Sequence, residues 1–140
     1  MTEMGHFAGA VEKKALDVYA QSRVSTASPS ELVLMMYDAA IKNMKAAFEH
    51  IAGKNFAAAN IAITKAEDIV EELRSSLNVE AGEVALALDS IYDYVYRSLI
   101  MSNVKKDAEI LSNCIKVLEH IRGAWAEMAR TRTRPEEAWG

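Results

Sequence analysis

The sequence predicts an all-α protein: an antiparallel up-down four-helix bundle with an additional short N-terminal helix or extended lid segment. Three observations favour this fold class. The 140-residue chain is rich in good helix formers and contains only two prolines and six glycines. Four segments of roughly 20–25 residues repeat their apolar side chains at three- and four-residue spacing. The connections between these segments are short, as they are between antiparallel neighbours in a bundle.

The first bundle helix is expected to begin at Ser28 and to end at Gly53. Ser28 can cap the free amides of the first turn, Pro29 suits the first helical position, and Glu31 completes a capping box. Gly53 is a plausible left-handed stop. The stretch 32–37 is apolar all round, so this part of the helix must be covered on more than one side.

Three further helices are expected at 56–77, 83–102 and 107–130, with Asn55 able to cap the first of them and Asp107 able to start the last. The helix at 56–77 has a small-residue face that would let a neighbouring helix or a ligand helix approach closely: Ala58, Ala59, Ala62 and Ala66. The helix at 83–102 is expected to turn one stripe to the core: Val84, Leu88, Ile91, Val95 and Leu99. The core stripe of the last helix includes Leu111, Cys114, Leu118, Trp125 and Met128.

The chain is therefore divided into three parts. Residues 1–27 form an N-terminal lid or cap segment, residues 28–130 form the bundle, and residues 131–140 form a polar, disordered tail. A short amphipathic helix in the first part would be marginal alone, because isolated helices of this length rarely persist in water. The first part must dock on the bundle or stay loose.

Composition excludes several classes of function. The formal net charge of −4 argues against nucleic acid as the partner, because phosphate binding needs a cationic face. No apolar run approaches the ~20 residues that span a bilayer, so membrane insertion is not expected. Cys114 is the only cysteine, which rules out an internal disulfide and fits a reducing cytoplasm. We expect a cytoplasmic protein without a cofactor.

The histidines leave one catalytic alternative open. A di-iron bundle needs Glu-x-x-His on two helices, and only Glu3 and His6 have that spacing, outside the predicted bundle. No metal site and no nucleophile–base pair can be assembled, so an enzyme is not expected. A phosphotransfer bundle needs a single exposed histidine on a helix, and His50 or His120 could serve. A structural subunit that merely oligomerises is a third interpretation.

The tyrosines of the third helix point to a protein contact. Tyr92 and Tyr96 lie four residues apart, and helical geometry sends Tyr94 away from both. At least one of the three must then lie at a groove or on the surface. An apolar ring with a polar tip suits a protein interface.

A set of short motifs runs in one order between residues 16 and 128: YAQSRV at 19–24, ASPSEL at 27–32, LMMYD at 34–38, KAEDIVEEL at 65–73 and IYDYVYRSL at 91–99. Asn103, Asp107, Arg122 and Trp125 follow at matching spacing. This set resembles the FliS family, the bacterial flagellar export chaperones for flagellin. The resemblance implies an antiparallel helical bundle that holds the disordered C-terminal part of flagellin in the cytoplasm. It also implies that the chaperone prevents early polymerisation and, without ATP, helps to deliver flagellin to the export gate.

The resemblance also suggests where partners bind. Leu16 and Tyr19 match family positions associated with contacts to client and export machinery, and residues 1–27 are expected to cover the groove when no client is present. The free protein is expected to be a monomer or a weak homodimer. The residues predicted to bind partners are Leu16, Tyr19, Val24, Ala59, Ala62, Ala66, Tyr92, Tyr94 and Tyr96.

Overall fold

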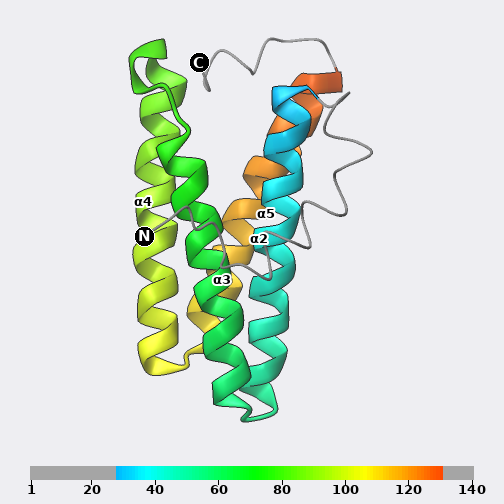
Figure 1. The fold of residues 1–140 in the computed structure, drawn as a ribbon, viewed down its shortest axis with the longest axis vertical. Helices are drawn as coiled ribbons and strands as arrows, with labels where there is room; N and C mark the ends of the chain where they lie inside the picture. Colours follow the sequence, from blue (N-terminus) through cyan, green and yellow to red (C-terminus); the bar gives the residue numbers. More distant parts are fainter. Residues whose placement is uncertain (1–27, 131–140) are drawn as a thin grey trace.

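The computed structural model describes residues 28–130, and the expectations for the segments at 1–27 and 131–140 fall outside this range. The described part consists of α2 (Pro29–Ala52), α3 (Phe56–Ser75), the short 3₁₀-helix η1 (Val79–Ala81), α4 (Glu83–Lys105) and α5 (Ala108–Arg130). Consecutive α-helices run in opposite directions (Figure 1), so the expected antiparallel four-helix bundle is confirmed. No helix in this part of the chain is long and apolar enough to cross a membrane.

The four helices form a ring in which each has two neighbours. α2 packs on α3 and α5, and α4 packs on the same two helices (Figure 1). α2 and α4 therefore occupy opposite corners of the bundle. Each helix contributes a buried stripe to one core, with fully buried members that include Tyr37, Met44, Ile63, Leu73, Tyr92, Leu99, Leu111 and Leu118.

The helix starts follow the expected capping residues. The Glu31 amide donates to Ser28 Oγ at 3.2 Å and the Ser28 amide donates to Glu31 Oε1 at 2.9 Å, which completes the capping box of α2. Asn55 Oδ1 accepts from the Ala58 amide at 3.2 Å at the start of α3. These side chains satisfy amides that have no partner inside their helices.

The end of α2 differs from the expectation. Gly53 has φ −86°, and the left-handed residue is Lys54, with φ 60°. The Lys54 amide donates to Ile51 O at 2.9 Å and the Asn55 amide donates to His50 O at 2.8 Å, the hydrogen-bond pair of a Schellman motif. The sequence prediction was wrong by one residue, because the turn must place Asn55 where it can cap α3.

The observed ends of two other helices, α3 and α4, also differ from the predicted ends. α4 continues to Lys105, three residues past the expected end, and α3 stops at Ser75. α4 ends on a second left-handed lysine, Lys106, with φ 50°. The ammonium of Lys106 donates to the carbonyl oxygen and to Oδ1 of Asn103, both at 2.8 Å, and this local bonding helps to hold an uncommon backbone conformation.

Ion pairs connect the helices at two sides of the ring. Between α2 and α5, Arg122 Nε lies 2.5 Å from Asp38 Oδ1 and Lys45 Nζ lies 2.9 Å from Glu119 Oε2. All four side chains are substantially exposed, so each pair contributes at most about 1 kcal/mol. Their main effect is to favour one register of the two helices.

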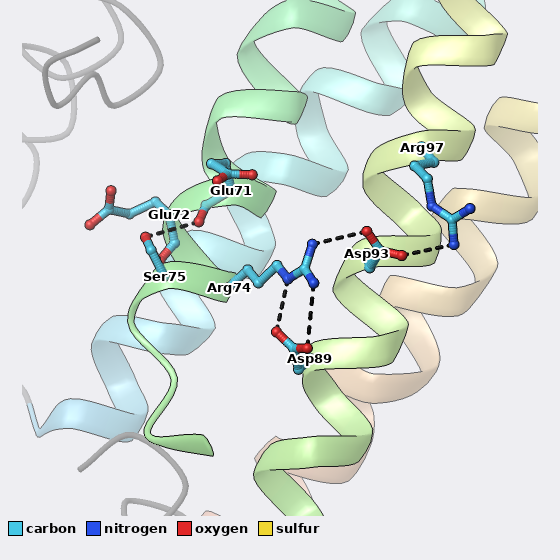
Figure 2. Close-up of polar contacts among 7 residues, drawn as sticks. All are labelled: Glu71, Glu72, Arg74, Ser75, Asp89, Asp93 and Arg97. Atoms are coloured by element: carbon cyan, nitrogen blue, oxygen red, sulfur yellow. Dashed lines mark hydrogen bonds and ion pairs between the residues drawn. The ribbon is translucent and has the colours of Figure 1, made fainter. Parts of the chain in front are cut away.

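A larger charged network connects α3 and α4 (Figure 2). Arg74 Nε lies 2.8 Å from Asp89 Oδ1, and Arg74 Nη1 lies 2.9 Å from Asp93 Oδ1. The second carboxylate oxygen of Asp93 accepts from Arg97 Nη2 at 2.7 Å. The hydrogen bond from Arg74 holds the pKa of Asp89 below its usual value. Asp93 is thus held by a partly exposed arginine of α3 and by a more exposed arginine of its own helix.

The turn after α2 generates a paired prediction. Replacing Lys54 by Gly should raise the free energy of unfolding by about 0.5–1 kcal/mol, because glycine adopts a positive φ without the steric cost that other residues bear. Replacing Gly53 by Ala should not destabilise the protein, since φ is negative there and an added Cβ would meet Glu49 O only at 3.6 Å. Urea unfolding measures both changes. A destabilised Gly53→Ala variant together with an unchanged Lys54→Gly variant would place the left-handed residue at 53 after all.

Candidate functional site

An apolar groove of about 240 Å³ lies between α4 and α5. All of its lining side chains are apolar or small: Val84, Ala87, Leu88 and Ile91 from α4, and Ile121, Ala124, Trp125 and Met128 from α5. Protein sites for apolar ligands are concave and lined in this way.

Small side chains keep the groove open. Ala87 and Ala124 are both exposed, and their side chains end at Cβ, so neither can fill the space between the two helices. Val84 was expected in the core but is 59% exposed on the rim. The ion pairs that close the α2–α5 and α3–α4 sides of the ring have no counterpart among the residues that line this groove. A partner's apolar side chains could therefore enter without displacing a charged group.

Trp125 forms the floor of the groove and is only 3% exposed. Its side chain is hydrogen-bonded to Tyr37, whose Oη lies 2.5 Å from Oη of Tyr92. The two tyrosine rings meet edge to face, with centroids 6.2 Å apart and an interplanar angle of 61°. These three residues come from α2, α4 and α5, and the Tyr37–Tyr92 hydrogen bond crosses the diagonal of the ring.

The tyrosine hydroxyls stay neutral and serve as hydrogen-bonding groups. Burial raises the pKa of Tyr37 to about 12, an effect that the hydrogen bonds from Tyr92 and Trp125 partly offset. Burial also raises the pKa of Tyr92, and the neighbouring Tyr37 raises it further. Neither group is suited to proton transfer near neutral pH. Their role is to satisfy one another in the core and to fix the position of the indole.

The middle of the α4–α5 side is closed. The side chains of Ser98 on α4 and Cys114 on α5 are hydrogen-bonded to each other. Cys114 is buried, and burial raises the pKa of its thiol to about 11. The prediction of a buried small residue at this position is confirmed, and the protonated thiol is a poor nucleophile.

The structure describes six of the nine residues predicted to bind partners. Leu16, Tyr19 and Val24 lie outside the described residues. Four of the six are buried in the core of the free protein: Ala59, Ala62, Ala66 and Tyr92. A partner could reach these four only if the bundle opened, so the small-residue face of α3 packs against the protein's own helices. Their role in binding a partner stays a prediction.

Tyr94 and Tyr96 lie in different surroundings. Tyr94 is 51% exposed and points away from Tyr92, as its spacing predicts. Tyr96 is half-buried on the α3 side of α4. Its pKa is raised, first by burial and then by the charges of Glu67, Glu71 and Asp68. Tyr94 is therefore the most exposed of the six described residues in the predicted set.

Glu67, one of these acidic groups, has a raised pKa. Burial raises its pKa to about 7, and the charge of Asp68 contributes to the same shift. The folded protein thus favours a protonated Glu67 under conditions where the unfolded chain carries a carboxylate.

Sequence reasoning missed the groove itself. The sequence pattern places Val84 and Met128 in core stripes and predicts no role for Ala87 or Ala124. A usable signal was present, because α4 carries apolar residues outside its core stripe, at Leu86, Tyr94, Met101 and Val104. A helix with these additional residues carries more apolar side chains than one buried face requires.

The two histidines that the structure describes, His50 and His120, lie on different helices. His50 is half-buried near the end of α2, and His120 is exposed on α5. Within residues 28–130, no group of three or more His, Cys, Asp and Glu side chains is placed to hold a metal ion.

Comparison with known proteins gives a consistent result. The sequence model of the family described as "Flagellar protein FliS" matches residues 12–132. The flagellar secretion chaperone FliS of Bacillus subtilis (strain 168) is 30% identical over 122 residues, covering 87% of this chain and 91% of that protein. The flagellar secretion chaperone FliS of Vibrio cholerae is 32% identical over 115 residues, covering 79% and 82%. That of Salmonella typhimurium is 30% identical over 119 residues, covering 84% and 88%.

The buried hydrogen bonds generate a stability prediction. Replacing Tyr37 by Phe should lower the free energy of unfolding by about 1–3 kcal/mol, because the partner groups of Tyr92 and Trp125 lose a buried hydrogen bond. Replacing Trp125 by Ala should cost more, about 3–5 kcal/mol, because it empties a large core volume. Tyr94→Phe, which removes an exposed hydroxyl, is the matched control and should stay within about 0.5 kcal/mol. Equal unfolding curves for Tyr37→Phe and Tyr94→Phe would show that the buried pair contributes no net stability.

The raised pKa of Glu67 predicts a pH dependence. Below the ordinary pKa of 4.5, Glu67 is protonated in both the folded and the unfolded state. As the pH rises from there through about 7, the unfolded chain loses this proton more readily than the folded protein does, so stability falls. Glu67→Gln should therefore stabilise the protein by roughly 1–2 kcal/mol at pH 8, allowing for partial solvation, and by little at pH 4. The neighbour Glu71, replaced by Gln, is the control. A pH-independent gain for Glu67→Gln would contradict this explanation.

Proposed function

The chain belongs to the FliS family of flagellar secretion chaperones, which are not enzymes, and from this membership we propose that it binds the C-terminal segment of flagellin in the groove between α4 and α5. The observation that carries the proposal is the open, wholly apolar groove of about 240 Å³ on a protein of this family. Binding there takes place in the cytoplasm, before the client is exported. The phosphotransfer alternative draws no support from the family match.

The shape of the groove suits an amphipathic helix. Val84, Ala87 and Ile91 follow one another on α4 at three- and four-residue spacing. From residue 84 to residue 91 this flank is about 11 Å long, or two helical turns. A client helix with apolar residues at i, i+3, i+4 and i+7 would match it. The alanines Ala87 and Ala124 would let its backbone approach closely.

Binding of this kind would allow the protein to act as a chaperone without catalysing a reaction. A filament subunit polymerises through amphipathic segments, so a protein that covers one of them removes the contact that starts assembly. The client segment becomes ordered on binding, which costs part of the gross contact energy, about 2–5 kcal/mol or more. The complex, with its client still unassembled, would then be presented to the cytosolic domain of the export gate.

The N-terminal segment is proposed to regulate the same groove. An exposed apolar surface invites aggregation, and residues 1–27 carry apolar side chains at Leu16, Tyr19 and Val24. We propose that this segment covers the groove in the absence of client. It then leaves the groove when flagellin binds.

A charge in the groove tests the binding site. Ala124→Glu should weaken binding of full-length flagellin at least tenfold, which corresponds to about 1.4 kcal/mol, because a carboxylate would be desolvated against apolar side chains. Ala57→Glu makes the same change at an exposed position of α3 and should leave the affinity unchanged. Flagellin lacking its C-terminal segment should bind neither protein. Equal affinities for the two variants would place the client elsewhere.

The thermodynamics of binding provide an independent check. Burial of apolar surface while the client orders predicts a clearly negative heat-capacity change, with favourable enthalpy opposed by entropy. Salt should have little effect, because the groove lining carries no charge. Calorimetry at several temperatures and ionic strengths measures both quantities. A heat-capacity change near zero, or an affinity that collapses at moderate salt, would favour an electrostatic surface contact.

The lid proposal predicts the effect of a deletion. Removing residues 1–20 should strengthen binding of flagellin or promote self-association, because the groove would then be uncovered. Binding and sedimentation assays of the truncated and full-length chains measure the two effects. If both are unchanged, the N-terminal segment acts only as a tether.

A further inference from the structure

The groove between α4 and α5 reaches the end of the bundle where α4 begins and α5 ends (Figure 1). Val84 lies in the first turn of α4, and Met128 lies two residues before the last residue of α5. We call this end of the groove, between Val84 and Met128, the groove mouth. Residues 131–140 follow a helix that itself lines the groove, and they leave it within one helical turn of the mouth.

Charge is divided unequally between the two ends of the bundle. The half that contains the groove mouth, residues 28–40, 66–94 and 119–130, has twelve Asp and Glu side chains against three Arg and no Lys. The other half, residues 41–65 and 95–118, has three Asp and Glu against eight Lys and Arg. A segment with positive charge is therefore favoured at the groove mouth.

Two carboxylates stand beside the groove mouth. Glu83 precedes Val84 on α4 and Glu127 precedes Met128 on α5, and both glutamates are exposed. Glu127 is paired with Arg130. Glu83 makes no ion pair within residues 28–130, so its carboxylate can accept a cation from a docked segment.

Residues 131–140, TRTRPEEAWG, carry their charges in an order that matches the bundle. Arg132 and Arg134 come first, near the carboxylates of the groove mouth. Residues 136–137 are both glutamate, and a chain that runs down the groove would carry them towards the half of the bundle that is rich in lysine. Trp139 follows, and it is the only large apolar side chain of this segment. An indole is a common anchor at protein interfaces.

The segment is long enough to reach the whole lining of the groove. An extended chain spans at most ~3.6 Å per residue, so the four residues from Arg130 to Arg134 cover up to ~14 Å. That length suffices to cross from α5 to α4, since packed helix axes lie ~8–10 Å apart. The five residues from Arg134 to Trp139 cover up to ~18 Å. The lining of α4 from Val84 to Ile91 is only about 11 Å long.

We propose that residues 131–140 occupy the groove when no client is bound, with Trp139 against the apolar lining and Arg134 beside Glu83. A tethered segment has an effective concentration in the millimolar range, so a contact too weak to form between separate molecules is populated within one chain. The effect of this docking on flagellin rests on the function proposed above, whereas the docking itself does not.

The N-terminal segment is proposed above to cover the same groove, but it joins the bundle at a different corner. Residue 27 adjoins α2, which lies opposite α4 and does not line the groove. Residue 131 adjoins α5, which does, so the C-terminal segment has the more direct path. We expect the groove of about 240 Å³ to hold one segment at a time. The two segments and the client would then exclude one another.

Methyl NMR of the full chain without client tests the docking. Trp139→Ala removes an aromatic ring from the groove, so the methyl signals of Ile91 and Met128 should shift relative to the unmodified chain. The signals of Ile61, which is 57% exposed on α3, should not shift. Ala138→Ser changes the neighbouring position without removing a ring and is the matched control. Groove signals that are identical in Trp139→Ala and the unmodified chain would overturn the proposal.

A charge exchange tests the contact at the groove mouth. Arg134→Glu and Glu83→Arg should each move the groove signals towards those of Trp139→Ala, because like charges would then meet. The double variant restores opposite charges and should return the signals towards their original positions. A double variant no closer to the unmodified chain than the single variants would exclude the contact between Arg134 and Glu83, and with it the proposed path of the segment.

Two results would assign the groove to another occupant. If removal of residues 1–20 shifts the groove signals and Trp139→Ala does not, the N-terminal segment is the occupant. If the shift caused by Trp139→Ala disappears on dilution of the protein, the indole enters the groove of a second copy and not that of its own chain. Either result would overturn the proposal.

Flagellin binding separates this inference from the proposed function. Because a docked segment reduces the fraction of chains whose groove is free, Trp139→Ala should lower the dissociation constant for flagellin about two- to tenfold. If the groove signals shift in Trp139→Ala while the affinity for flagellin is unchanged, the segment docks in the groove and the client binds elsewhere. That result would contradict the proposed function and support the docking of residues 131–140.

Discussion

The central constraint on this protein is that α4 is apolar on more sides than the bundle can cover. In a ring of four helices each member has only two neighbours, and α4 packs on α3 and α5. Its buried stripe, with Leu88, Tyr92, Val95 and Leu99, accounts for one face. The remaining apolar residues can be covered only by something added to the bundle. The groove beside α5 and the exposed side chains of Leu86, Ile100 and Val104 are two consequences of this excess.

A groove is useful only if its walls keep their positions when it is empty. The hydrogen bonds among Tyr37, Tyr92 and Trp125 supply this constraint, because they join α2 to its neighbour α5 and to α4 at the opposite corner of the ring. Apolar packing alone tolerates small shifts at modest cost, whereas buried polar groups must keep their partners. Ion pairs on the α2–α5 and α3–α4 sides favour single registers of those helices. The side between α4 and α5 carries the apolar groove.

Most of the fold could be predicted from local chemistry. Ser28 and Asn55 cap helices because short polar side chains satisfy free amides, and the apolar spacing set the core faces of α2, α3 and α5. The end of α2 could not be placed correctly, since both Gly53 and Lys54 can end a helix. That choice depends on where the next helix must start, which is a property of the folded turn.

The candidate site was less predictable for a related reason. Periodicity separates Tyr94 from Tyr92 and Tyr96 but does not say which side faces the core when a helix is apolar nearly all round. The alanines of α3 could have lined a partner groove, yet they share the face of Ile63, Ile69 and Leu73, and the larger residues drive that face inward. The groove lies between the consecutive helices α4 and α5, and that Ala87 and Ala124 both line it is visible only in three dimensions.

The most direct test of the central claim is to map the client by methyl NMR. The full chain would be titrated with the C-terminal segment of flagellin while the methyl signals of Val84, Ile91, Ile121 and Met128 are followed. If the uncovered face of α4 beside α5 receives the client, these signals should shift together, and the exposed methyl groups of Ile61 on α3 should not. Shifts confined to α2 and α3, with the groove methyls unchanged, would contradict the account.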